Sequence, residues 1–141
     1  MNVRGAPLIG VTAAFGLALS VLKDPRENNI KDSYEKLFDT RPTAVNLKWA
    51  LDKILNNVLK VDISKRFDLA FNLAIEIRKN DILKCQKIGE YGCKLLENIY
   101  KKNRKRINIL THCNAGWLAT IDWGTALSPI YKAFQKKIPL H

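Results

Sequence analysis

Residues 107–116 read INILTHCNAG, and this stretch decides how the last third of the chain should fold. Its first five residues, Ile107–Thr111, form a short β-prone run, and a tight turn over His112–Gly116 follows directly. An apolar stretch with helical character then extends from Trp117 to Phe134. A strand, a tight turn and a helix in this order open an α/β domain. The sequence therefore predicts, over 105–141, the first strand-turn-helix unit of a truncated, Rossmann-like α/β domain.

Upstream of this unit, apolar residues recur at the spacing of amphipathic or buried helices. Pro7 suits the first turn of a buried helix, Thr40 or Thr43 could cap a second strongly apolar one, and Ser64 could cap a third. Asn80 or Asp81 is a further helix start. The predicted helical segments are 6–22, 44–59, 64–77 and 80–101, and the polar segment 27–38 is either a short helix or an irregular excursion. We expect a helical domain over 1–104, and so a mainly α chain overall.

The apolar segment 6–22 is interpreted as a buried helix rather than as a membrane span or a signal peptide. It is rich in Ala and Gly, shorter than the roughly 18 uncharged residues that a spanning helix needs, and closed by Lys23. It also stands too close to Met1 to leave room for a basic leader region. We therefore expect no membrane partner.

The cysteine pattern favours a reducing, cytoplasmic environment. The chain has three cysteines, and Cys85 and Cys93 would lie about 12 Å apart on a helix, too far to pair. The two histidines, His112 and His141, do not complete a zinc-binding set with them. We expect neither a disulfide nor a metal site.

The positive charge of the chain raises the question of nucleic-acid binding. There are 24 Lys and Arg residues against 13 Asp and Glu, which gives a net charge of +11. The densest cluster is 101–106, KKNRKR, but no base-stacking motif or recognition-helix signature accompanies it. We interpret this run as a solvated linker, and nucleic acid is not an expected partner.

Cys113 is the residue in INILTHCNAG whose side chain could act as a catalytic group. A thiol at the end of a strand and just before a helix experiences the positive end of the helix dipole, and the amides after Asn114 could hold a phosphate or an oxyanion. The alternative is a small buried Cys at a strand end. His112 is not expected to act as its base, because neighbouring residues on an extended chain point to opposite faces.

Two further motifs place an arginine next to a helix start. Arg4, Gly5 and Ala6 precede Pro7, and the 41–43 motif, RPT, repeats the same arrangement. Free backbone amides and an arginine together suit a phosphate group. A solvated surface arginine is the alternative for each motif taken alone. The three anion-ready motifs together indicate a phosphorylated small molecule as the ligand.

Four stretches resemble successive signature blocks of one enzyme family. They are RGAPLIGVTAAFGLALS, RPTAVNLKWALDKI, IGEYGCKLL and ILTHCNAGWLATIDWGTALSPI, in that order and with plausible gaps. They resemble the methylthioribose-1-phosphate isomerases of methionine salvage. The same superfamily holds the regulatory subunits of the initiation factor 2B exchange factor and ribose-1,5-bisphosphate isomerase.

The resemblance implies an aldose–ketose isomerase that converts 5-methylthioribose 1-phosphate to 5-methylthioribulose 1-phosphate without a cofactor. It implies substrate contacts for Arg4, Gly5, Ala6 and Arg41, and a catalytic role for Cys113. It also implies a homodimer for the intact family protein. The partner acid of the family is an Asp in a later α/β domain, so we expect this chain by itself to be catalytically silent. The alternatives are a non-catalytic initiation-factor-2B-like regulatory module and a ribose-1,5-bisphosphate isomerase-like enzyme.

Overall fold

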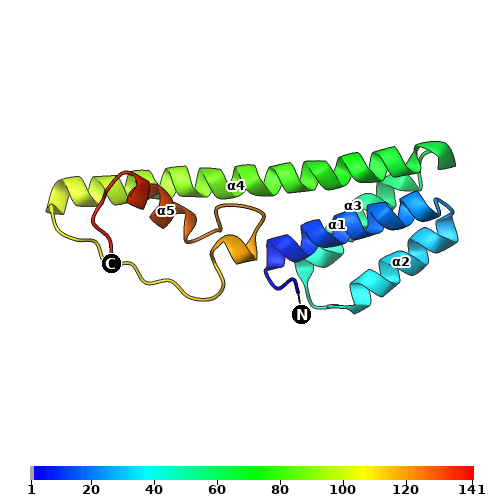
Figure 1. Cartoon of the computed structure of the whole chain (residues 1–141), viewed down its shortest axis with the longest axis horizontal. Helices are drawn as coiled ribbons and strands as arrows, with labels where there is room; N and C mark the ends of the chain where they lie inside the picture. Colours follow the sequence, from blue (N-terminus) through cyan, green and yellow to red (C-terminus); the bar gives the residue numbers. More distant parts are fainter. Residues whose placement is uncertain (1) are drawn as a thin grey trace. The chain divides into compact units, whose positions relative to one another are not determined.

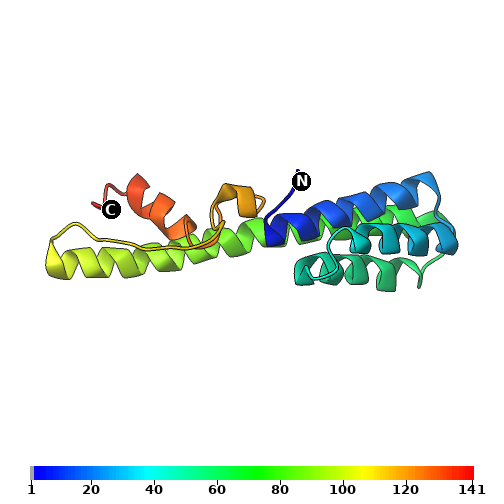
Figure 2. The same cartoon turned by 90° about the horizontal axis from the view of Figure 1, so that it is seen from below.

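The computed structural model describes residues 2–141 and is mainly helical, as the sequence predicts (Figure 1, Figure 2). Its internal contacts divide the chain into two compact units, the first ending at Lys79 and the second covering Asn80–His141. The division falls within helix α4, which extends over Arg66–Asn103. The two units are therefore described separately.

The first unit is built from three consecutive helices and the beginning of α4. The helices are α1 (Ala6–Lys23), α2 (Glu27–Asp39) and α3 (Val45–Val58), followed by a short 3₁₀ turn (Ile63–Lys65). Helix α1 packs against both α2 and α3, which also contact each other (Figure 2). The first part of α4 joins them through an edge-to-face contact between Phe15 and Phe71, whose ring centroids are 5.9 Å apart.

Helix α1 is the centre of this unit. By length and composition it is the one helix within 2–141 that could cross a membrane, but a core helix passes the same test. Its packing is that of a core helix, as predicted, because small and large apolar side chains interlock against α2 and α3. Its buried residues are Ile9, Gly10, Val11, Ala13, Ala14, Leu17, Ala18 and Val21.

Two glycines of α1 differ in the space around them. A Cβ on Gly10 would lie 2.7 Å from the backbone oxygen of Asn46, so this glycine allows α1 and α3 to approach closely. A Cβ on Gly16 would lie 3.5 Å from the nearest Leu37 methyl carbon, an ordinary van der Waals distance.

We expect Gly10→Ala and Gly16→Ala to change stability in opposite directions. Gly10→Ala should destabilise the chain by about 1–3 kcal/mol, because a backbone atom must move to admit the methyl group. Gly16→Ala should stabilise it by about 0.5–1 kcal/mol through higher helix propensity. Urea unfolding of both variants measures these changes. A shift of the same sign in both would contradict the packing described for α1.

Two sequence-based details of the helices are wrong. The segments expected over 64–77 and 80–101 form one helix, α4, because no Pro or Gly interrupts the backbone ladder near Asn80. The carboxylate of Asp81 does not cap a helix start but accepts a hydrogen bond from the amide of Ile121 at 2.9 Å. Neither Thr40 nor Thr43 caps α3, since its N-cap residue is Ala44 and no side chain caps it.

In the second unit, helix α5 (Ser128–Gln135) packs closely against α4. Gly89 and Gly92 of α4 make this possible, because a Cβ on Gly89 would collide with Ser128 and one on Gly92 with Pro129. The hydroxyl of Ser128 donates a hydrogen bond to the backbone oxygen of Cys85 at 2.8 Å. The glycines of the IGEYGCKLL stretch therefore serve the packing of α5 on α4.

The strand-turn-helix unit predicted over 105–141 does not form as expected. No strand is assigned within 2–141, and 107–111 makes only an isolated parallel bridge, between Ile107 and Leu140. A strand needs a partner along its length, and only the last three residues of the chain, 139–141, lie beside 107–109. The helix expected from Trp117 onward is replaced by a 3₁₀ turn, Trp117–Ala119, and a loop before α5.

Candidate functional site

In the first unit, the structure brings together the two arginine motifs that the sequence singles out. Arg41 lies between α2 and α3, and its Nη1 donates a hydrogen bond to the backbone oxygen of Arg4 at 3.2 Å, across 37 positions of sequence. Arg4, Gly5, Ala6 and Arg41 therefore gather at the beginning of α1. A guanidinium group has five N–H donors, so this one hydrogen bond leaves others for a ligand.

The beginning of α1 is suited to an anion. Its N-cap residue, Gly5, has extended backbone angles (φ −68°, ψ 136°) and no side chain caps the helix. The first turn holds no acidic residue, and Pro7 lacks an amide hydrogen there in any case. The positive end of the helix dipole and the uncapped amides favour a negative group at this position. Arg4 and Ala6 are exposed and Gly5 is buried between them.

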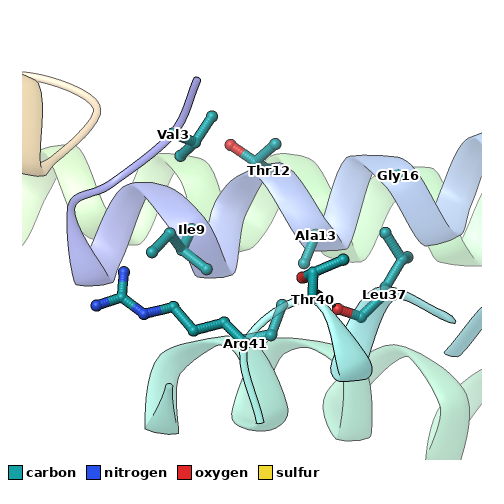
Figure 3. A pocket seen from close by; sticks show the side chains of 9 residues that line it. Val3, Ile9, Thr12, Ala13, Gly16, Leu37, Thr40 and Arg41 are labelled. Carbon is teal, nitrogen blue, oxygen red and sulfur yellow. Dashed lines mark hydrogen bonds between the residues drawn. The ribbon is translucent and has the colours of Figure 1, made fainter. Parts of the chain in front are cut away.

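A cavity of about 270 Å³ opens along α1, between Ile9 and Gly16 (Figure 3). It is formed by Val3 before α1, by α1, the end of α2, the α2–α3 loop and one residue of α3. Arg41 lines one end of the cavity. Its side chain extends toward the first turn of α1 (Figure 3). The lining residues are Val3, Ile9, Thr12, Ala13, Gly16, Leu37, Thr40, Arg41 and Leu47.

Sequence reasoning did not find this cavity. The cavity borders Gly16, whose missing side chain leaves room for a methyl group in ordinary contact with Leu37. The signal that could have indicated it is the pair of threonines, Thr12 and Thr40, which border an otherwise apolar surface near Arg41.

Cys113 belongs to the second unit, in the loop between α4 and the 3₁₀ turn. Its thiol is exposed and its backbone φ is +72°, in the left-handed region. This conformation costs a non-glycine residue about 1–3 kcal/mol and is concentrated at functional sites, where the surrounding structure maintains it. The chain bends at Cys113 and Asn114, but no hydrogen-bonded turn is assigned over His112–Gly116, where the sequence predicts one.

The loop that follows Cys113 is held by a close backbone contact. The amide of Thr125 donates to the backbone oxygen of Ala115 at 2.9 Å, and Gly124, at φ +78°, packs against Ala115 and Gly116. Trp117 stacks on Tyr131 of α5, with ring centroids 4.6 Å apart. These contacts fix the chain immediately after Cys113.

The local surroundings of Cys113 differ from the sequence-based expectation in one respect. The α-helix expected to begin just after Cys113 begins only at Ser128, so the argument from the dipole of that helix does not apply. Burial raises the pKa of the Cys85 and Cys93 thiols, which favours their protonated form. Cys113 is the exposed thiol of the three. No group of three or more His, Cys, Asp or Glu side chains that could hold a metal ion occurs within 2–141.

Comparisons with known proteins place these residues in a family context. The chain matches the initiation factor 2 subunit family over residues 2–141. It is 51% identical over 143 residues to methylthioribose-1-phosphate isomerase from Escherichia coli O45:K1, and 50% identical over 141 residues to that of Paramagnetospirillum magneticum. Each comparison covers 100% of this chain, but only 38% and 39% of the respective relative.

Solved structures give the same grouping. The chain superposes on 5-methylthioribose 1-phosphate isomerase from Pyrococcus horikoshii with a TM-score of 0.83 and 36% identity, over 99% of this chain and 40% of that one. It superposes on the delta subunit of translation initiation factor eIF-2B from A. fulgidus with a TM-score of 0.80 and 35% identity, over 99% and 41%. The chain thus spans about two-fifths of the length of its relatives, and it belongs to the initiation factor 2 subunit family.

Proposed function

We propose that this chain is part of an aldose–ketose isomerase of methionine salvage, which converts 5-methylthioribose 1-phosphate to 5-methylthioribulose 1-phosphate. The observation that carries the proposal is the convergence of Arg4, Gly5, Ala6 and Arg41 at the uncapped start of α1. Relatives at about 50% identity bear the name of this isomerase, which supports the same substrate.

In this proposal the phosphate of the substrate lies at the beginning of α1. The guanidinium groups of Arg4 and Arg41 supply charge, and the backbone around Gly5 and Ala6 supplies amide donors without a side chain in the way. The hydrogen bond from Arg41 to the Arg4 backbone oxygen orients both motifs before the ligand arrives. Binding then requires little reorganisation.

Cys113 is the proposed catalytic residue. The reaction moves hydrogen from C2 to C1 of the sugar and makes a ketone at C2, so it needs a group that exchanges protons with the substrate. The anomeric phosphate blocks the ordinary ring opening, and a site that excludes water would protect the opened sugar. By the family resemblance, the thiol of Cys113 is the proton-exchanging group, and its partner acid is an Asp of a later domain.

The same proposal covers the wider organisation of the protein. Residues 1–104 form the helical domain and 105–141 begin an α/β domain. Hydrogen bonds in parallel order support the latter: Ile107 donates to Pro139, His141 donates to Ile107 and Ile109 donates to His141. We propose a cytoplasmic enzyme that needs no cofactor and forms a homodimer when intact.

A second candidate function is a regulatory module of the initiation factor 2B type. The observation that favours it is the superposition on the eIF-2B delta subunit, which is almost as close as that on the isomerase, at nearly the same identity. The fold therefore does not separate the two functions. A regulatory module would bind a protein partner. It would need neither a phosphate-binding site at the start of α1 nor Cys113.

The test compares two arginines that both stand beside a helix start. Arg41→Ala should weaken binding of 5-methylthioribose 1-phosphate about 10- to 100-fold, because a charge-assisted hydrogen bond is lost. Arg26→Ala is the matched control: Arg26 precedes α2 and pairs with Asp24 at 2.6 Å, away from the α1 start. Calorimetric titration measures both. Equal affinities of Arg41→Ala and the wild-type protein would refute the proposal that the substrate phosphate binds at the start of α1.

A further inference from the structure

Another cavity lies in the second unit, where α4 ends and the segment 107–111 begins (the yellow end of α4 in Figure 1). Its volume is about 620 Å³, within the usual range for small-molecule sites, about 300–1,000 Å³. The described residues that line it all lie within 99–108, so neither Cys113 nor the loop that follows it takes part. The cavity is therefore separate from the candidate catalytic thiol.

The basic run 101–106, KKNRKR, has a defined backbone structure at this cavity and does not form the linker that the sequence suggests. Its first three residues belong to the last turn of α4. The amide of Arg104 donates to the backbone oxygen of Tyr100 at 2.8 Å, and the φ of Arg104 is +51°, so the chain turns there. Nε of Arg106 donates to the backbone oxygen of Leu140 at 3.0 Å. The run is therefore a structured corner that carries its cations on a fixed backbone.

The charge on this cavity is positive throughout. Three cations line it: Lys102, Lys105 and Arg106. No carboxylate is among the described lining residues, and the sequence has no acidic residue between Glu97 and Asp122. Glu97 itself forms an ion pair with Lys136. Because like charges that share a cavity repel one another, an anion between them removes that repulsion. The cavity therefore favours a ligand with several negative charges.

The other lining residues indicate which kind of anion fits. Asn103 and Asn108 supply side-chain amide donors for the oxygens of such a ligand. The apolar part of the lining consists of Ile99 and Ile107, and no aromatic ring is among the described lining residues. Proteins that bind single-stranded nucleic acid stack its bases on aromatic side chains. The lining therefore favours a compact anion over a nucleic-acid strand.

We propose that this cavity binds a compact oligophosphate, whose linked phosphate groups contact Lys102, Lys105 and Arg106 together. Phosphate oxygens accept hydrogen bonds from ammonium and guanidinium groups, and Arg106 keeps further N–H donors after its bond to Leu140. A single phosphate group has fewer oxygens to share among the three cations. The site uses none of the residues to which the proposed function assigns a role, so each proposal can fail without the other.

The first measurement compares two inorganic probes. The whole chain is titrated with tripolyphosphate and with phosphate by calorimetry, at about 0.15 M salt, where distant charges are screened. Tripolyphosphate should bind about tenfold more tightly than phosphate, because it can contact more than one cation of the cavity at once.

Two double variants with the same change in net charge show whether the cavity or the whole basic run is responsible. Lys102→Gln with Lys105→Gln removes two lining cations and should weaken tripolyphosphate binding about tenfold. Lys101→Gln with Arg104→Gln removes two cations of the same run that do not line the cavity, and should weaken binding less than about threefold. All four side chains are exposed, so both variants should fold like the wild-type protein.

A loss of affinity confined to the first double variant would support the site. Equal losses in the two double variants would show only a diffuse attraction to the basic run and would overturn the proposal. Equal binding of phosphate and tripolyphosphate, or no binding of tripolyphosphate, would overturn it too. A single-stranded oligouridylate that binds more tightly than tripolyphosphate, and loses affinity in both double variants, would indicate a nucleic-acid surface in place of the oligophosphate site.

Discussion

Replacing Cys113 with Ser in the intact protein that contains these residues should lower isomerase turnover about 10²–10⁴-fold. This is the usual contribution of one positioned proton-transfer group, and a serine hydroxyl exchanges a proton far less readily than a thiol near neutral pH. Substrate affinity should change little, because the phosphate lies at the α1 start in the proposal. The measurement is steady-state turnover together with a binding titration.

The matched control for this substitution is Cys93→Ala. Cys93 is buried against Ala133 and Ile138, and this burial raises the pKa of its thiol and so favours the protonated form. We expect the turnover of the Cys93→Ala variant to stay within about twofold of the wild-type value, with a small loss of folding stability. Comparable losses of turnover in both variants would indicate a general effect on folding and would contradict the role of Cys113.

Gly124→Ala should destabilise the loop that follows Cys113 by about 2–4 kcal/mol. The φ of Gly124 is +78°, which disfavours any side chain, and a Cβ would lie 2.5 Å from the backbone oxygen of Ala115 and 2.7 Å from the Cα of Gly116. Both atoms belong to the backbone, so neither can move by a change of rotamer. Hydrogen exchange of Ala115–Ser128 and urea unfolding measure the effect.

A second variant separates the two causes of this destabilisation. Asn tolerates a positive φ better than Ala does but carries the same Cβ. Gly124→Asn should therefore be nearly as unstable as Gly124→Ala if the close contact with Ala115 dominates. A recovery of most of the lost stability in Gly124→Asn would show that the backbone angle, and not the contact, is the main requirement.

The helical part of the fold could be predicted because its signals are local. The apolar spacing and the position of Pro7 are enough to place α1, and they locate α3 to within one residue at each end. The continuity of α4 through Asn80 was missed because Asn and Asp signal a helix start only when their side chains turn back to the backbone. Asp81 instead bonds to Ile121, a contact 40 positions away that no local pattern reveals.

The site was predictable to a different degree in each unit. Arg4 and Arg41 were identified from their motifs, but their hydrogen bond and the cavity beside them depend on how α1, α2 and α3 pack. The strand over 107–111 was predicted from β-propensity, which reflects fit to a sheet and not an independent backbone preference. Because 107–109 pair only with 139–141, the β-prone residues have no sheet to join and a strand is not formed.

The proposed function requires the protein that contains this chain to bind and isomerise a methylthio sugar phosphate. The most direct measurement follows 5-methylthioribose 1-phosphate by NMR in the presence of the intact protein that contains this chain, beside its Arg41→Ala variant. The account predicts that the C2 ketone of the product appears with the wild-type protein, and at least tenfold more slowly with the variant at subsaturating substrate. Absence of the ketone with the wild-type protein would contradict the proposed isomerase, and absence of sugar-phosphate binding as well would favour the regulatory module.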